Sequence, residues 1–86
     1  MSEDRAAGLA LEGLAFLAAR PDAFQRFADL SGLDPGTAAA RAAEPEFLAA
    51  VTDFLLADER LLVDFCEIGS VDARDIHMAR HILGGR

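Results

Sequence analysis

Residues 45–69 read PEFLAAVTDFLLADERLLVDFCEIG, and this stretch decides the fold. Its apolar residues recur every three or four positions, the period of one buried helix face. In an unbroken helix, Asp58 would fall on that face, in line with Leu55 and Leu62. A buried, unpaired carboxylate costs several kcal/mol, whereas an Asp at the N-cap stabilises a helix by about 1 kcal/mol. We therefore predict that the chain breaks or bends at Asp58, so that two helices meet there.

Proline and glycine divide the rest of the chain into further short helical segments. We expect six helices, from about 3 to 19, from 21 to the glycine at 32, from 35 to about 43, from 45 to 58, from 58 to the glycine at 69, and from 72 to the glycine at 84. Asp34 and Asp72 are expected to cap the third and sixth helices. The predicted fold is all-α, a compact bundle of about six short helices.

One hydrophobic core is expected to hold the large apolar residues of these helices. Its predicted members are Phe16, Leu17, Phe24, Phe27, Phe54, Leu55, Leu62 and Phe65. In the fifth helix the buried positions are expected to be Leu61, Leu62, Phe65 and Ile68. In the sixth they are expected to be Ile76, Ala79 and Leu83.

The sequence matches itself at an offset of 38 residues. Residues 15–34 read AFLAARPDAFQRFADLSGLD, and residues 53–72 read DFLLADERLLVDFCEIGSVD. The repeated unit predicts a helix, a break, a helix, a turn, an Asp cap and a further helix. Two interpretations stand side by side: a pseudo-twofold, three-plus-three helix repeat with units 15–43 and 53–81, or chance similarity between amphipathic helices.

Length and composition give a single helical domain over residues 1–86. The chain is 52% hydrophobic, too apolar for a disordered segment, and its 18 alanines and 12 leucines favour helices over strands. The single cysteine fits a reducing compartment. The acidic start and the lack of any run of about 18 apolar residues predict neither a secretory signal nor a membrane segment. We therefore expect a cytoplasmic protein.

Charge is unevenly distributed along the chain. The formal net charge is −7, and residues 44–72 hold eight acids against one arginine. Residues 73–86 hold three arginines against one aspartate. This acidic balance, without any lysine, argues against nucleic-acid binding and favours a basic protein partner or a second copy of the chain.

Three stretches carry a resemblance to a known family: RFADLSGLDP at 26–35, DFLLADE at 53–59 and ARHILGG at 79–85. With these the chain resembles a short bacterial family catalogued as domain of unknown function thirty-five seventy-two, over about residues 9–85. The resemblance implies a small all-helical protein and brings no activity with it. Members often lie beside genes for two-component response regulators, which implies a signalling accessory.

Motifs for catalysis are not visible in the sequence. Neither a nucleophile elbow, a phosphate loop nor a paired-carboxylate motif is present. Cys66 flanks an apolar helix face without a basic neighbour in sequence, which favours a packed thiol over a reactive one. His77 and His81 have the i, i+4 spacing of metal ligands, but two ligands do not make a site. We expect no enzyme, no cofactor and no metal.

The remaining function class is a small protein-interaction or adaptor protein. Its candidate surface combines exposed acids of the fourth and fifth helices with the outer face of the sixth. The residues are Glu46, Asp53, Asp64, Glu67, Arg74, His77, Met78 and His81. The alternative is a small-molecule-binding or catalytic bundle whose site is not visible in the sequence. A polar internal pocket favours that alternative, whereas a solid core with an exposed apolar patch favours an interaction protein.

Overall fold

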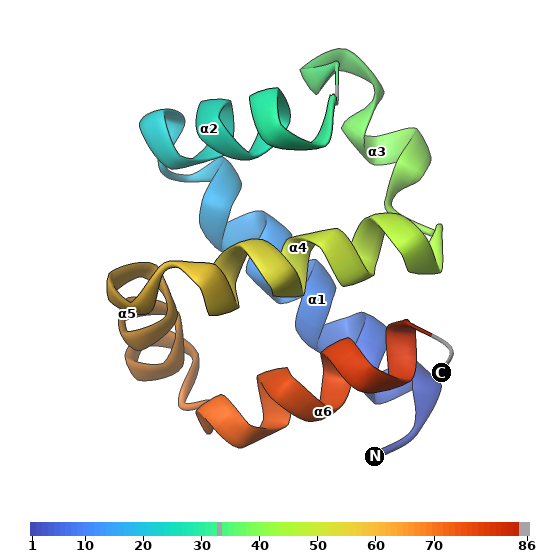
Figure 1. The fold of residues 1–86 in the computed structure, drawn as a ribbon, viewed down its shortest axis with the longest axis vertical. Helices are drawn as coiled ribbons and strands as arrows, with labels where there is room; N and C mark the ends of the chain where they lie inside the picture. Colours follow the sequence, from blue (N-terminus) through green and yellow to red (C-terminus); the bar gives the residue numbers. More distant parts are fainter. Residues whose placement is uncertain (33, 85–86) are drawn as a thin grey trace.

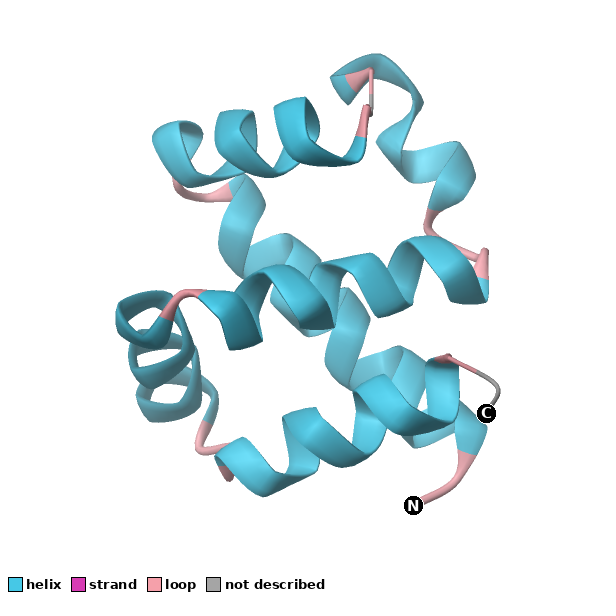
Figure 2. Ribbon diagram, in the orientation of Figure 1, coloured by secondary structure: helices cyan, strands magenta, loops and turns pink. Residues whose placement is uncertain are grey.

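The computed structural model describes residues 1–32 and 34–84, and over these residues the chain is helical and contains no strand (Figures 1 and 2). The helices are α1 (Glu3–Ala18), α2 (Pro21–Ser31), η1 (Pro35–Thr37, a 3₁₀ turn), α3 (Ala38–Arg41), α4 (Pro45–Ala57), α5 (Glu59–Gly69) and α6 (Ala73–Leu83). The all-α prediction is confirmed.

The predicted third helix is much shorter than expected. In place of a helix to about residue 43, the described residues form the 3₁₀ turn η1 and the four-residue α3. Asp34 accepts a hydrogen bond from the Gly36 backbone N–H at 2.9 Å, and its carbonyl accepts one from the Thr37 N–H. These turn hydrogen bonds, together with few large apolar side chains to anchor the segment, favour a tight turn over a long helix. The part of the chain described therefore has five helices of eleven residues or more, rather than six.

Three helices form the centre of the molecule, which measures 30 × 25 × 17 Å. α1 crosses α4, and α6 packs against both of them (Figure 1). Ala6 and Ala10 of α1 and Ala79 of α6 are fully buried, and such small side chains let helices approach closely. α2 lies against α1 and α4, and α5 lies at the end of α4. This arrangement leaves α2 and α5 at the periphery, each with part of its surface free.

The predicted core is confirmed in its main members. Phe16, Leu17, Phe27, Leu55 and Phe65 are buried in one cluster. The other three predicted residues are half-buried and pack against that cluster; they are Phe24, Phe54 and Leu62. The burial of Leu61, Ile76, Ala79 and Leu83 is also confirmed.

Ile68 is the exception, because the sequence predicted it to be buried and its side chain is 68% exposed. The helical period does not account for this exposure, because Ile68 lies seven residues after the buried Leu61 and only about 20° from it around the helix. Ile68 is in the last turn of α5, one residue before the helix ends. Its exposure therefore depends on where α5 ends relative to the neighbouring helices, which the sequence does not specify.

The break at Asp58 is confirmed. Asp58 has an extended backbone with φ −122° and ψ 98°, and it ends α4 while it caps α5. Its carboxylate accepts a hydrogen bond from the Leu61 backbone N–H at 3.2 Å. Its second carboxylate oxygen lies 3.4 Å from Arg26 of α2. The aspartate is therefore a half-exposed cap.

Backbone features recur at the 38-residue offset. Arg20 and Asp58 both precede a helix, with φ and ψ of −124° and 92° at Arg20 and of −122° and 98° at Asp58. Gly32 and Ser70 both end a helix in the left-handed region, with φ 69° and 53°. The predicted C-terminal residue Gly69 is thus the last helical residue, and Ser70 is the cap. The segments that follow differ, because η1 and α3 stand where α6 has a full helix. The three-plus-three repeat stays a prediction.

No helix in the described part of the chain combines the length and apolar character needed to cross a bilayer.

Candidate functional site

Every residue of the predicted interaction surface is exposed. Glu46 and Asp53 lie on α4, Asp64 and Glu67 on α5, and Arg74, His77, Met78 and His81 on α6. Exposure is what a contact surface requires, and no binding follows from it alone. The assignment of these residues to a partner stays a prediction.

Several of these charges have partners within the molecule. Asp53 forms an ion pair with Arg80, which joins α4 to α6. Arg74 lies 3.2 Å from Asp72, and the Arg74 backbone N–H donates to the same carboxylate at 2.9 Å. These hydrogen bonds from Arg74 lower the pKa of Asp72. Exposed pairs of this kind add little to the stability of a fold. The Asp72–Arg74 contacts are at the α6 N-terminus, and the Asp53–Arg80 pair holds the second half of α6 against α4. His77, Met78 and His81 are left for other contacts.

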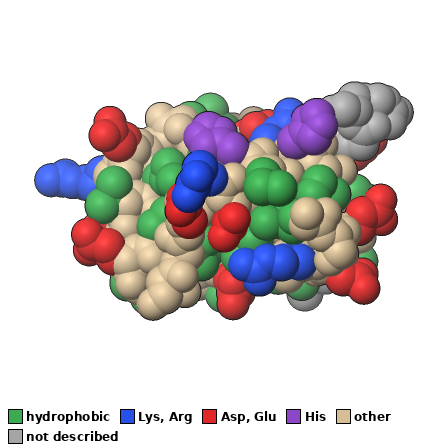
Figure 3. Space-filling model, turned by 90° about the horizontal axis from the view of Figure 1, so that it is seen from below, with side chains coloured by type: hydrophobic (Ala, Val, Ile, Leu, Met, Phe, Trp, Pro, Cys, Tyr) green, Lys and Arg blue, Asp and Glu red, His purple; other side chains and the backbone are tan. Residues whose placement is uncertain are grey.

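The outer face of α6 combines both histidines with an exposed methionine. Met78 is 46% exposed. Figure 3 shows the histidines on this face, with hydrophobic side chains gathered beside them. Among the described residues, no three His, Cys, Asp or Glu side chains gather into a set that could ligate a metal.

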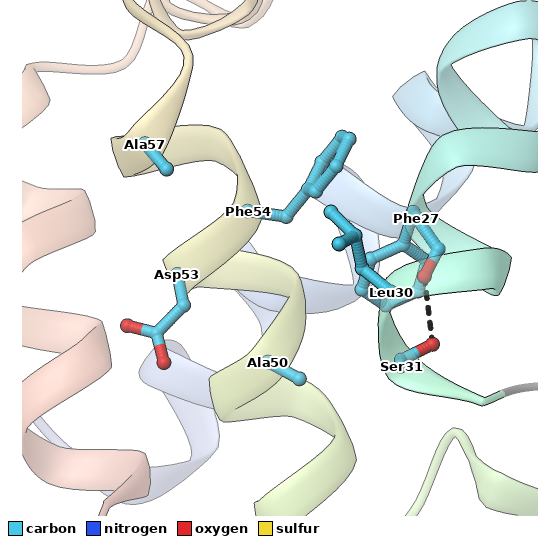
Figure 4. A pocket seen from close by; sticks show the side chains of 7 residues that line it. All are labelled: Phe27, Leu30, Ser31, Ala50, Asp53, Phe54 and Ala57. Carbon is cyan, nitrogen blue, oxygen red and sulfur yellow. Dashed lines mark hydrogen bonds between the residues drawn. The ribbon is translucent and has the colours of Figure 1, made fainter.

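A groove that the sequence did not indicate lies between α2 and α4; we call it groove A (Figure 4). Its volume is about 260 Å³, and it is lined by Phe27, Leu30, Ser31, Ala50, Asp53, Phe54 and Ala57. The rings of Phe27 and Phe54 meet edge to face, 5.4 Å apart. The Ser31 hydroxyl donates to the Phe27 carbonyl at 2.8 Å, within α2. Asp53 is at the edge of the groove, and its carboxylate points away from Phe27, Leu30 and Phe54 (Figure 4) and pairs with Arg80 of α6. The lining is therefore mainly apolar.

Leu30 is the most exposed large apolar side chain at groove A, at 79%. It extends from α2 beside Phe27 (Figure 4). Leu30 is placed like Ile68: it lies seven residues after a buried residue, Ala23, about 20° from it around the helix, and in the last turn of α2. The apolar period of the sequence therefore contains no signal from which the groove could have been found.

A second groove, groove B, lies between α1 and α5. Its volume is about 400 Å³, and its lining consists of Glu12, Ala15, Phe16, Ala19, Arg20, Phe65, Ile68 and Gly69. The rings of Phe16 and Phe65 meet edge to face, 5.3 Å apart. The Arg20 guanidinium lies 3.6 Å from the centre of the Phe16 ring, a cation–π contact. Groove B thus also has an aromatic floor and an exposed aliphatic side chain, Ile68.

Cys66 fits the description of a packed thiol. It is half-buried between α5 and the start of α6, where Leu62, Val71 and Ala73 are neighbours. Burial raises the pKa of the Cys66 thiol, and the negative charge of Asp72 raises it further. A raised pKa leaves less of the reactive thiolate at neutral pH.

Comparison with known proteins gives one match. The sequence model of a family described as a protein of unknown function (DUF3572) matches residues 3–86. No curated protein and no solved structure matches the chain.

Proposed function

Because the chain belongs to the DUF3572 family, whose description names no activity, we propose from its surface that it is a small protein-interaction module. Groove A is the proposed contact, and its occupant is an amphipathic helix of a partner protein. The observation that carries this proposal is Leu30, which lies 79% exposed beside a groove with an aromatic floor. Exposed apolar patches with a polar edge are typical of protein-binding surfaces.

Charge complementarity favours a basic partner helix. Asp53 is at the edge of groove A but pairs with Arg80, and both residues border a neighbouring hollow that contains Glu46. Glu46 is therefore the acid at this edge of α4 that forms no ion pair among the described residues. The surrounding segment 44–72 has eight acids against one arginine. Lysines or arginines beside the aliphatic stripe of a partner helix would complement these groups and be steered by the net charge of −7.

The alternative of a small-molecule or catalytic site has less support. The described hollows are open at the surface, and among described residues no buried side-chain polar atom lacks a hydrogen-bond partner. A binding pocket for a polar substrate usually converges several polar groups. Groove A offers Asp53 and a Ser31 hydroxyl that already donates to the backbone.

An adaptor acting in the cytoplasm, as a signalling accessory, is the setting we propose for this module. A reducing compartment keeps the thiol of Cys66 free. The outer face of α6 is then available as a second contact, through Arg74, His77 and Met78. The replacements Arg74→Glu and His77→Ala should reduce the amount of partner captured if this face takes part in binding. If neither replacement changes that amount, the outer face of α6 is not a contact surface.

The test of groove A uses a defined probe. A labelled peptide of about four helical turns carries leucines at helical spacing and lysines elsewhere; its matched control carries glutamates in place of the lysines. Fluorescence anisotropy should show binding of the lysine peptide and at least about tenfold weaker binding of the glutamate peptide. The variant Leu30→Glu should bind the lysine peptide more weakly than the wild type, by a similar factor.

Val63→Glu is the matched control variant. Val63 is 47% exposed on α5 and lines neither groove, so the same charge is added at a comparable surface position. The proposal requires a loss of affinity in Leu30→Glu and little change in Val63→Glu. Equal losses in both variants would mean that the peptide follows the overall charge, and groove A would be rejected.

Self-association of the chain is the alternative to a partner protein, because it could involve the same charged surfaces. An acidic α4–α5 surface and a basic α6 face could join two copies of the chain. Sedimentation of the pure protein at low and high salt tests this, because screening weakens contacts between exposed charges. A monomer at every salt concentration leaves the partner helix as the occupant.

A further inference from the structure

The aromatic residues of groove A correspond to those of groove B at the 38-residue offset. Adding 38 to Phe27 gives Phe65, and subtracting 38 from Phe54 gives Phe16. The Phe27–Phe54 pair has a ring separation of 5.4 Å and an interplanar angle of 66°. The Phe65–Phe16 pair has 5.3 Å and 64°. Two pairs from different parts of the chain thus adopt the same geometry.

The other residues that line the two grooves also correspond at this offset. Leu30 of groove A corresponds to Ile68 of groove B, and the two are 79% and 68% exposed. The other residues of groove A correspond to residues of groove B as follows: Ser31 to Gly69, Ala50 to Glu12, Asp53 to Ala15, Phe54 to Phe16 and Ala57 to Ala19. Every residue that lines groove A has a counterpart that lines groove B. Arg20 is the additional residue of groove B.

The crossing of α1 and α4 explains how this correspondence between the two grooves arises. Residue 13 corresponds to residue 51, and residue 17 to residue 55. A Cβ atom placed on Gly13 would lie 3.4 Å from Val51 Cγ1 and 2.9 Å from Leu55 Cδ1. The corresponding residues Gly13 and Val51 therefore lie together where the two helices cross. From this crossing α2 reaches across to α4, and α5 reaches across to α1.

The charges at the two grooves differ. At groove A the Asp53 carboxylate pairs with Arg80 of α6. Groove B has both Glu12 of α1 and Arg20, whose guanidinium lies on the Phe16 ring. The equivalence of the two grooves therefore rests on their apolar residues, and the attraction of a basic helix comes from the net charge of −7.

From this correspondence we propose that grooves A and B are two equivalent sites, and that one chain holds two copies of the same basic amphipathic helix. A homodimeric partner, which presents one such helix from each subunit, is the occupant with the matching symmetry. This inference rests on the proposed function of groove A and extends it by a second site and a stoichiometry.

Titration calorimetry with the lysine peptide counts the sites. The wild-type chain should bind two peptides, Leu30→Glu one, Ile68→Glu one, and the double variant none. Val63→Glu should still bind two. Both replaced residues are largely exposed, so the variants should keep the wild-type helical circular dichroism, and the stoichiometry is read from folded protein.

The outcomes separate the two proposals. One bound peptide, lost in Leu30→Glu and unaffected by Ile68→Glu, overturns the equivalence of the grooves and leaves groove A as the interaction site. Two bound peptides that both persist in the double variant overturn both proposals, as does the absence of binding at peptide concentrations of about 1 mM.

Discussion

Phe65 and Ile68 lie one turn apart on α5 and should respond oppositely to truncation. Phe65 is 3% exposed with its ring against Phe16, whereas Ile68 is 68% exposed. Phe65→Ala should lower the free energy of unfolding by about 3–5 kcal/mol, because it leaves a cavity in the core. Ile68→Ala should change it by less than about 0.5 kcal/mol. Denaturant unfolding of both variants measures the difference, and comparable losses would contradict the core assignment.

The Cys66 thiol should react more readily once Asp72 loses its charge. Burial and the Asp72 carboxylate both raise the pKa of this thiol. Asp72→Asn removes the charge and keeps a side-chain oxygen able to cap α6. The pKa should therefore fall partway toward its ordinary value, and alkylation by iodoacetamide should reach half its maximal rate at lower pH.

Asp75→Asn provides the control for that titration. It removes the same charge one turn further along α6, at a residue that pairs with Arg5 and does not act on the thiol. The alkylation profile of Asp75→Asn should match that of the wild type. A profile for Asp72→Asn that is unchanged, or shifted to higher pH, would show that the carboxylate does not act on Cys66.

Two glycines in α1 should differ in their response to alanine. A Cβ on Gly8 would meet no atom within 4 Å, whereas one on Gly13 would meet Leu55 Cδ1 at 2.9 Å. Gly8→Ala should raise the free energy of unfolding by about 0.5–1 kcal/mol through helix propensity. In Gly13→Ala the same gain is outweighed by crowding of about 1–3 kcal/mol, because Leu55 is 1% exposed and cannot turn aside.

Thermal unfolding of the two variants beside the wild type measures this contrast. Gly8→Ala should melt at a higher temperature than the wild type, and Gly13→Ala at a lower one. A stabilised Gly13→Ala would mean that α1 and α4 can separate slightly at their crossing.

Helix boundaries were predictable from the sequence where a side chain makes its own hydrogen bond. Asp58 shows this, since both its position in the apolar pattern and its capping group favour a break. Burial was less predictable at residues such as Ile68, which is on the same side of α5 as the buried Leu61 but lies exposed in the last turn. The prediction of the third helix was wrong for a different reason: an aspartate followed by a proline is as typical of the start of a turn as of the start of a helix.

At the scale of the whole molecule, the net charge should make stability depend on salt. The chain has a net charge of −7 within 30 × 25 × 17 Å. The screening length falls from about 30 Å at 0.01 M salt to about 10 Å at 0.1 M. Repulsion among the acids is therefore screened over this range, and the melting temperature should rise.

Asp64→Asn with Glu67→Gln is the matched variant for this effect. Neither acid forms an ion pair among the described residues, and both are exposed on α5. The double variant should melt higher than the wild type at low salt and gain less from added salt. An equal salt response in both proteins would assign the effect to something other than charge repulsion.

The candidate site was predictable as a set of exposed residues and unpredictable as grooves. Periodicity placed residues such as Asp53 and Met78 on outer helix faces, and their exposure is confirmed. The grooves form between helices from different halves of the chain, α2 with α4 and α5 with α1. Such pairings depend on how α1 and α4 cross, which the pattern within any one helix does not specify.

The contact between α1 and α6 also bears on when the chain can fold. These helices are far apart in sequence, yet they form one of the main contacts of the core. Until Ile76, Ala79 and Leu83 have been synthesised, the apolar residues of α1 and α4 that face α6 stay uncovered. Contacts that span most of a chain slow folding relative to helices that pack on their neighbours in sequence. On the ribosome the core can therefore close only after α6 has emerged, so the earlier helices remain exposed to chaperones and proteases throughout elongation.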